Sequence, residues 1–288
     1  MARLKLLHSS SGSSWSKHSK DKDKQKDDNK RKKSKHDAGV PPTSTVTKIE
    51  KKAEHDVNFS TSSMDMDPAV AHLSIIPKLL FEGMVNEKAA TVESAVEYLA
   101  DMFRLSSDKR IESYQAGGHT VLVVTMKKWV ANESIQTSSC RCIQNMTCTN
   151  AHAKESFAIV GGLEAVVTAM RSFPTSQRVQ RSGCGAVMNL LSGHEDEGSH
   201  ILTNMATRFV NDYDGIALVV KAMQEFPEEV KIQLWGNGLF QNLATHPEFR
   251  LPLMKSGAIT ATGGSLELYS DHELIRQYAS KFLKVMFS

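Results

Sequence analysis

Three cysteines and one histidine lie close together near the middle of the 288-residue sequence, in the order Cys140, Cys142, Cys148 and His152. Cysteine and histidine are common ligands of zinc, so their chemistry suggests a metal site. Their C-x-C-x5-C-x3-H spacing, however, differs from the paired C-x2-C spacing of structural zinc sites. Residues two apart on a helix point about 200° apart, which makes it difficult for Cys140 and Cys142 to share one metal. We therefore expect neither a metal site nor a bound cofactor.

A second group of ionisable side chains is the segment 194–197 (His-Glu-Asp-Glu), which His200 follows. A zinc-dependent hydrolase would carry H-E-x-x-H on one helix, but Gly198 occupies the place of the second histidine. We find no phosphate-binding G-x-x-x-x-G-K-[ST] motif, no G-x-G-x-x-G after a strand and no G-x-S-x-G. The glycine pairs 161–162 and 263–264 are interpreted as helix boundaries. The sequence therefore predicts a protein that is not an enzyme.

The positive net charge of the chain comes from its N-terminal part. The formal charge of +3 sums 35 basic and 32 acidic side chains, but residues 1–40 alone hold 12 Lys/Arg and five Asp. This segment therefore carries +7 and the remainder −4. Residues 1–67 are dominated by Ser, Lys, Asp, Thr and His without apolar periodicity, which predicts a disordered tail.

A dense basic cluster lies within this tail: Lys30, Arg31, Lys32, Lys33 and Lys35. Such clusters are typical of nuclear-import signals and of nucleic-acid contacts, and a simple solvating tail is the third interpretation. No stretch approaches the ~18 apolar residues of a membrane-spanning helix, and no signal-peptide-like apolar run follows Arg3 and Lys5. Four cysteines in a chain of this length do not form a disulfide framework. We expect no membrane insertion or secretion, and a location in the cytoplasm, the nucleus or both.

From about residue 68 onward the apolar residues recur with a helical period, which predicts that the body of the chain is all-α. In the segment 91–103, for example, Val92, Val96 and Leu99 fall on one face. Comparable patterns occupy the segments 135–146, 179–190, 232–243 and 275–286.

These helices repeat along the chain. Tripeptides containing glycine stand at 117–119, 161–163, 214–216 and 256–258, and their second residues are 44, 53 and 42 positions apart. The helices that begin at Leu163 and Ile216 are near copies, and each ends at a Phe-Pro pair that starts a connector. We place the roughly ten extra residues of the longest interval in the segment 193–204. The body then divides into five units: about 68–116, 117–160, 161–213, 214–255 and 256–288.

The helix after each connector repeats most strictly, and its most regular polar residues are Asn145, Asn189 and Asn242. Nine residues before each asparagine stands a glutamine, ten before it a β-branched residue, and six before it a small residue. The first and last units keep the same frame, with Met102 and Val285 in the place of the asparagine. The apolar positions would line one helix face and form a core that only neighbouring units can close. Units of about 40–47 residues with two or three helices are typical of armadillo and HEAT arrays.

The combination of a glycine pair, an apolar helix, a connector and a small–apolar–Asn–Leu helix resembles the armadillo repeat of β-catenin and importin-α. The segments 184–192 (CGAVMNLLS) and 238–244 (GLFQNLA) carry the resemblance most clearly, and it covers about residues 68–288. It implies a right-handed α-α superhelix in which the third helices of the units line a concave groove. It also implies that Asn145, Asn189 and Asn242 face this groove and hydrogen-bond the main chain of an extended peptide. The alternative is that each asparagine bonds only within its own repeat.

Helical geometry identifies the neighbours of the asparagines, because residues four and seven positions earlier share the same face. These neighbours are Arg141, Ser138, Gly185, Ser182, Gly238 and Trp235. Trp235 is the best candidate for an aromatic side chain on the groove floor, with half-buried packing between units as the alternative. Arg178, Arg181 and Lys231 lie near the beginnings of third helices and would make one flank of the groove positive. An acidic peptide would suit them, although solvated surface charges explain them equally well.

Importin-α carries a tryptophan four residues before its groove asparagines, where this chain has Arg141, Gly185 and Gly238. Recognition of basic import signals is therefore not expected. We predict a scaffold or adaptor without enzymatic activity that binds an extended peptide or a helix of a partner protein in the groove. The alternatives are a nucleic-acid- or chromatin-associated protein that uses the basic tail, and a regulatory subunit of an enzyme complex. Self-association through the last repeat is a further alternative, because Phe282 or Phe287 could face outward there.

Overall fold

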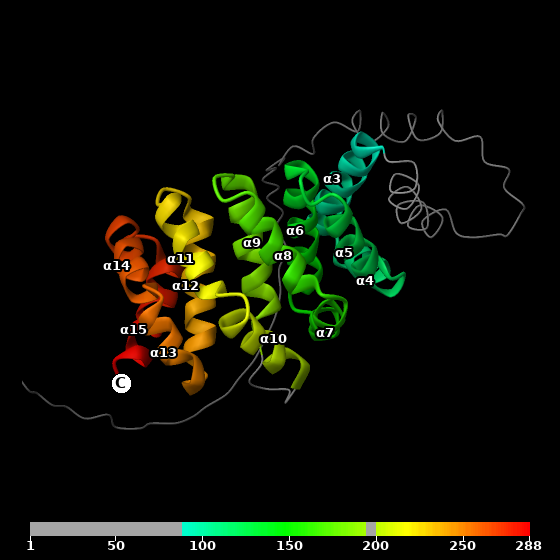
Figure 1. Cartoon of the computed structure of the whole chain (residues 1–288). Helices are drawn as coiled ribbons and strands as arrows, with labels where there is room; N and C mark the ends of the chain where they lie inside the picture. Colours follow the sequence, from blue (N-terminus) through cyan, green and yellow to red (C-terminus); the bar gives the residue numbers. More distant parts are fainter. Residues whose placement is uncertain (1–87, 194–199) are drawn as a thin grey trace, which may run out of the picture. The chain divides into compact units, whose positions relative to one another are not determined.

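Helices and short connectors make up the described structure, a computed structural model that covers residues 88–193 and 200–288 (Figure 1). No strand occurs in these two ranges, so the all-α prediction is confirmed for them, and no helix there is long and apolar enough to cross a membrane. The predicted tail, the basic cluster at 30–35 and the segment 194–197 lie outside the described residues. The helices are α3 (Ala89–Leu105), α4 (Ser107–Gln115), α5 (Gly118–Lys128), α6 (Glu133–Thr147), α7 (Ala151–Val160), α8 (Gly162–Ser172), α9 (Gln177–Leu190), α10 (His200–Asn211), α11 (Gly215–Glu225), α12 (Val230–Ala244), α13 (Pro247–Lys255), α14 (Ala258–Leu268) and α15 (Glu273–Met286).

The helices form an array of three-helix units in which equivalent helices lie side by side. The third helices are in contact in chain order, from α3 to α6, α9, α12 and α15. The second helices α5, α8, α11 and α14 contact one another in the same order, and the first helices are α4, α7, α10 and α13. The colours of Figure 1 follow this order from α3 at one end of the array to α15 at the other. An array of this kind is a solenoid, as the sequence repeat predicts.

In each unit, the residue just before the second helix has a left-handed backbone conformation, and the chain changes direction there. These residues are Gly117, Gly161, Asp214 and Gly257, with φ of 81°, 84°, 44° and 86°. Most side chains with a Cβ are disfavoured in this conformation, and Asp is among the few that tolerate it. Gly257 is thus equivalent to Gly117 and not to Gly118, so the fourth anchor chosen from the sequence is one residue out of register. The corrected spacings are 44, 53 and 43 residues.

The glycine pair 263–264 does not mark a helix boundary, which corrects the prediction from the sequence. Helix α14 runs through both residues, from Ala258 to Leu268. A Cβ added at either glycine would meet nothing within 4 Å, so no close contact requires them. The break lies at Gly257 instead, because the backbone adopts positive φ there.

Replacing Gly264 by alanine is expected to raise the free energy of unfolding by about 0.5–1 kcal/mol, because glycine inside a helix loses excess chain entropy on folding. The site is exposed and has room for the methyl group. Urea denaturation followed by circular dichroism measures the change. Gly257→Ala is the matched control and should be destabilising, since a Cβ is strained at its φ of 86°. Equal destabilisation by both substitutions would contradict the assignment of Gly264 to an unconstrained helix position.

The extra residues of the longest interval lie around the start of α10. This helix begins ten residues after the end of α9, whereas α7 begins four residues after the end of α6. The insertion predicted at 193–204 therefore falls partly on residues 194–199, outside the described ranges, and partly on the first turn of α10. Lys154 holds the start of this segment, since its Nζ donates to the carbonyl oxygen and the hydroxyl of Ser192 at 2.8 and 2.9 Å.

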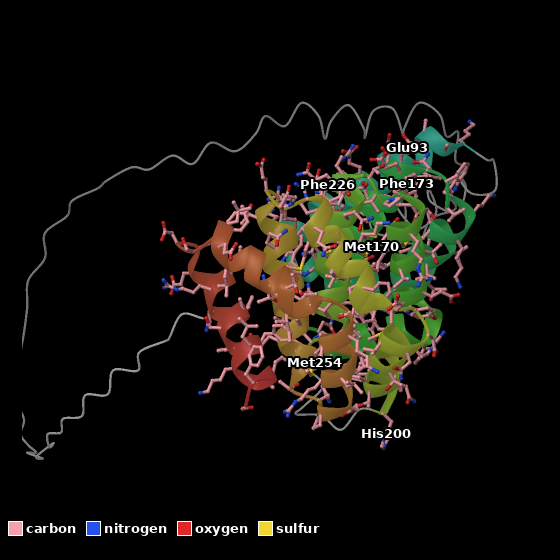
Figure 2. The ribbon with its side chains drawn as sticks, turned by 60° about the vertical axis from the view of Figure 1, so that its left-hand side comes forward. Glu93, Met170, Phe173, His200, Phe226 and Met254 are labelled. Carbon is pink, nitrogen blue, oxygen red and sulfur yellow. The ribbon has the colours of Figure 1, made fainter. Side chains whose placement is uncertain are left out.

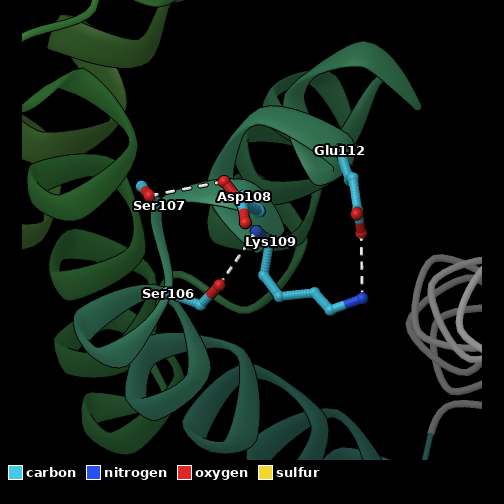
Figure 3. A network of polar contacts seen from close by, with 5 residues as sticks. All are labelled: Ser106, Ser107, Asp108, Lys109 and Glu112. Carbon is cyan, nitrogen blue, oxygen red and sulfur yellow. Dashed lines mark hydrogen bonds and ion pairs between the residues drawn. The ribbon is translucent and has the colours of Figure 1, made fainter.

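Side-chain caps determine where several helices begin. At the junction of α3 and α4 the Ser106 hydroxyl accepts a hydrogen bond from the main-chain N–H of Lys109 at 3.3 Å. Lys109 also pairs with Glu112, at 3.0 Å between Nζ and Oε2 (Figure 3). Asn132 and Ser176 cap α6 and α9 in the same way. These caps satisfy N–H groups that a helix leaves unpaired, so they position the beginnings of α4 and of the third helices α6 and α9.

Large apolar side chains close the contacts between units. Within residues 88–193 and 200–288, five phenylalanines are fully buried: Phe103, Phe157, Phe209, Phe240 and Phe282. The ring centroids of Phe240 on α12 and Phe282 on α15 are 5.7 Å apart. Phe282 therefore faces the core, in contrast to the outward position considered from the sequence. Phe287 is 72% exposed.

Candidate functional site

A buried glutamine fixes each of three third helices to the second helix of its own unit. Gln136, Gln180 and Gln233 are at most 3% exposed, and each Nε2 donates to two main-chain carbonyls at 2.7–3.1 Å. The acceptors are Met126 and Trp129 for Gln136, Met170 and Phe173 for Gln180, and Met223 and Phe226 for Gln233. The second acceptor of each pair is the C-cap residue of α5, α8 or α11. The glutamines thus donate to carbonyls at the ends of the second helices, of which the C-cap carbonyls also accept the main-chain N–H groups of Asn132, Ser176 and Glu229.

A second set of bonds links successive units at the edge where the third helices begin. Glu93 on α3 accepts from Nδ2 of Asn132, and Glu133 on α6 accepts from the hydroxyl of Ser176, both at 2.6 Å. Figure 2 shows Glu93 at this edge of the array and His200 at the opposite edge. Both donors are N-caps of the next third helix, so each bond sets the position of one third helix relative to the one before it.

The third-helix face consists of the residues at each asparagine position and one, four and seven positions before it, on α3, α6, α9, α12 and α15. Nδ2 of Asn145 donates to the carbonyl oxygen of Ala100 at 3.3 Å, and Nδ2 of Asn189 donates to that of Gln144 at 2.8 Å. Both acceptors belong to the preceding third helix, so these asparagines bond the neighbouring unit and not their own repeat. Asn242 makes no side-chain hydrogen bond within the described residues. All three side chains are half-buried, and their Oδ1 atoms have no partner there.

The same contact recurs between neighbouring third helices on this face. One partner stands one position before the asparagine position of its unit. The other stands four positions before the asparagine position of the next unit. The pairs are the ion pair Asp101–Arg141, Gln144–Gly185 and Met188–Gly238. A Cβ at Gly185 would stand 2.4 Å from Nε2 of Gln144, and one at Gly238 would stand 2.9 Å from the sulfur of Met188. The glycines therefore make room for the side chains that cover them.

Seven residues before the asparagine position, the face changes from small to aromatic side chains. Ser138 and Ser182 are 4% and 2% exposed, so neither offers a surface to a partner. Trp235 and its equivalent in the last unit, Tyr278, are half-buried. Trp235 packs partly against the core, and Nζ of Lys231 lies 6.0 Å from the centre of its ring. The structure therefore agrees with half-buried packing of Trp235, and its role as an aromatic side chain on the groove floor stays a prediction.

The three cations predicted on one flank have different surroundings. Nη1 of Arg181 lies 3.8 Å from Oε2 of Glu229, the N-cap of α12, and forms an ion pair inside the array. Arg178 is exposed and lines an open surface pocket of about 380 Å³ beside the connector 173–176. Lys231 is exposed and has no acidic partner within the described residues. Arg178 and Lys231 consequently carry positive charge at the surface.

The cysteine cluster is divided between the core and the surface. Cys140 and Cys142 are buried, whereas Cys148 and His152 are exposed. Burial raises the pKa of the Cys140 thiol to about 12 and also raises the pKa of Cys142, so both are protonated at neutral pH. The two buried cysteines therefore behave as small core residues. Within the described ranges, no group of three or more His, Cys, Asp or Glu could hold a metal ion.

Nine residues of the third-helix face were not anticipated from the sequence: Ala95, Tyr98, Asp101, Gln144, Met188, Gln241, Tyr278, Lys281 and Lys284. The repeat register contains the signal that would have found them. They stand one, four or seven residues before an asparagine position, or before the Met102 and Val285 that replace it. The sequence prediction considered the four- and seven-residue positions only on the three helices that carry asparagine.

Comparison with solved structures defines the class of fold. The chain is similar to a designed armadillo repeat protein, with a TM-score of 0.50 and 14% identity, over 73% of this chain and 99% of that one. It is also similar to an engineered protein, with a TM-score of 0.60 and 16% identity over 85% of this chain, which spans 59% of the length of that protein. No family model matches the sequence. Identities this low show the fold alone: the chain has an armadillo-like repeat fold, as the resemblance implies.

Proposed function

We propose that this chain is a protein-interaction scaffold or adaptor whose third-helix face binds an extended segment of a partner protein. The observation that carries the proposal is the state of the asparagine amides. Asn145 and Asn189 each use Nδ2 to bond the neighbouring helix, which orients the amide and leaves its Oδ1 without a partner in the described residues. An amide that retains an acceptor and a second N–H matches a peptide group, whatever side chain that peptide residue carries.

The spacing of the third helices suits an extended chain. Packed helices lie about 8–10 Å apart, and an extended chain advances about 3.3 Å per residue. Asparagines on successive third helices would therefore meet about every third residue of a bound segment. This function requires no catalytic step, because amides, cations and aromatic side chains bind a partner without transferring a proton.

Asn242→Ala tests the proposal most directly, because the Asn242 side chain bonds nothing within the described residues. We expect unchanged thermal unfolding and a partner affinity about tenfold weaker, the effect of one lost hydrogen bond. Proximity labelling with the wild-type chain identifies partners, and fluorescence anisotropy with the purified partner measures the affinity. Asn204→Ala, at an exposed position of α10, is the matched control. Equal affinities of the wild type and both variants would contradict a role for the asparagines.

A further inference from the structure

The third helices carry opposite net charges at the two ends of the array. Helices α3 and α6 together have four acidic and two basic side chains, a net charge of −2. Helices α9, α12 and α15 together have six basic and one acidic side chain, a net charge of +5. On the third-helix face itself, Asp101 and Arg141 cancel in the N-terminal half, which α3 and α6 form, whereas Lys281 and Lys284 give the C-terminal half, on α9, α12 and α15, a charge of +2.

The charged side chains in the N-terminal half of the face pair with each other. Asp101 and Arg141 form an ion pair across α3 and α6. These two are the charged residues of this half of the face, and because they pair with each other they offer a partner little that is not already satisfied.

The C-terminal half presents an apolar surface that we name the aromatic platform, consisting of Met188, Trp235, Gly238 and Tyr278. Because Gly238 has no side chain, Met188 and Tyr278 both lie against it: a Cβ there would stand 2.9 Å from the Met188 sulfur and 3.4 Å from the Tyr278 ring. Trp235 stands one turn earlier on α12. All three side chains remain half-buried, which leaves part of their apolar surface accessible.

Three surface lysines lie on the two helices that carry the aromatic side chains of the platform. Lys231 lies over the Trp235 ring, with 6.0 Å between Nζ and the ring centre. Lys281 and Lys284 are exposed on α15, four and one residues before Val285. No acidic side chain pairs with these three lysines within the described residues. An apolar contact surface bordered by unpaired cations is complementary to a large apolar side chain with carboxylates on either side.

We infer that the C-terminal half of the third-helix face selects an acidic extended segment that places one large apolar side chain on the aromatic platform. This inference rests on the proposed function and adds the chemistry of the partner and the half of the face that recognises it. The carboxylates of the segment pair with Lys231, Lys281 and Lys284, and its apolar side chain covers Trp235 and Tyr278. The asparagines hold its main chain.

Selection of displayed random peptides on the immobilised full chain tests this inference. We expect the selected peptides to be acidic and to contain one large aliphatic or aromatic residue. Their affinity should fall as the salt concentration rises. The double substitution Lys231→Glu and Lys281→Glu should lower the affinity for these peptides by about tenfold or more, since it replaces two attractions between opposite charges by repulsions. Lys221→Glu, at an exposed position of α11 outside the face, is the control for altered net charge and should bind as the wild type does. Changing the apolar residue of the winning peptide to alanine tests the platform without altering the fold of the protein.

The outcomes separate this inference from the proposed function. Selection of basic or uncharged peptides that bind the Asn242→Ala variant more weakly than the wild type would overturn the inference and leave the proposed function intact. Selection of acidic peptides whose affinity the double substitution does not change would also overturn the inference, because the basic residues of segment 1–40 would then explain their binding. Two outcomes would overturn the inference and the proposed function together. One is no enrichment of peptides above an uncoated surface, and the other is selected peptides whose affinity changes with neither Asn242→Ala nor the double substitution.

Discussion

Gln180→Ala is expected to lower the free energy of unfolding by about 2–4 kcal/mol, because the buried carbonyl of Met170 loses its donor and that of Phe173 keeps only the main-chain N–H of Ser176. Nε2 of Gln180 donates to Met170 at 2.7 Å and to Phe173 at 2.9 Å, and the residue is 2% exposed. Without this side chain the end of α8 has no donor from α9, and a cavity remains at the junction of the two helices. Chemical denaturation of the purified chain measures the change.

Two further variants separate the hydrogen bonds of Gln180 from its packing. Gln180→Met keeps the approximate volume but removes the donor, so it should still cost about 1–3 kcal/mol. Gln224→Ala, at an exposed position of α11, should change the stability by less than about 0.5 kcal/mol. A Gln180→Met variant as stable as the wild type would show that the two carbonyls do not need this donor.

Phe240→Ala is expected to cost about 3–5 kcal/mol, the range for truncating a fully buried phenylalanine. Phe240 is 0% exposed, and its ring contacts that of Phe282 across α12 and α15. Stability in a solenoid depends on contacts between neighbouring units, so the loss should be concentrated in the last unit. Hydrogen exchange should then show α15 opening before the rest of the array.

The same variant links stability to the third-helix face. Tyr278 and Lys281 lie on α15. An α15 that no longer packs on α12 should therefore also lower the affinity for acidic peptides at the aromatic platform. Phe287→Ala is the control, since Phe287 is 72% exposed and its truncation should cost less than about 0.5 kcal/mol. If both phenylalanine variants lost the same stability, the α12–α15 contact would not depend on the Phe240 ring.

The helices and their order could be predicted from the sequence, because apolar periodicity and glycine placement are local signals. The positive φ at Gly117 and Gly161 agrees with the predicted breaks. The pair 263–264 was misread as a break because a glycine permits positive φ without requiring it. Asp214 takes up the same conformation without being glycine, so composition alone does not locate these breaks.

The third-helix face could be predicted only in part. The helical wheel places Ser138 and Ser182 on the same side as the asparagines, yet both are buried. A wheel describes one helix and contains no information on how closely the next helix approaches. It therefore cannot separate a small residue that lies beneath a neighbour from one that faces a partner.

The sequence by itself determined the repeat: a period of apolar positions, a glutamine and an asparagine in constant register, and hence an all-α solenoid. Only the tertiary structure decided how the polar groups of the repeat are used. It places the Asn189 amide on the carbonyl of Gln144, 45 residues away, and brings Met188 and Tyr278 together over Gly238. The physical reason is that periodicity specifies which side of a helix is apolar, whereas such contacts depend on the distance and register between helices that are remote in the chain.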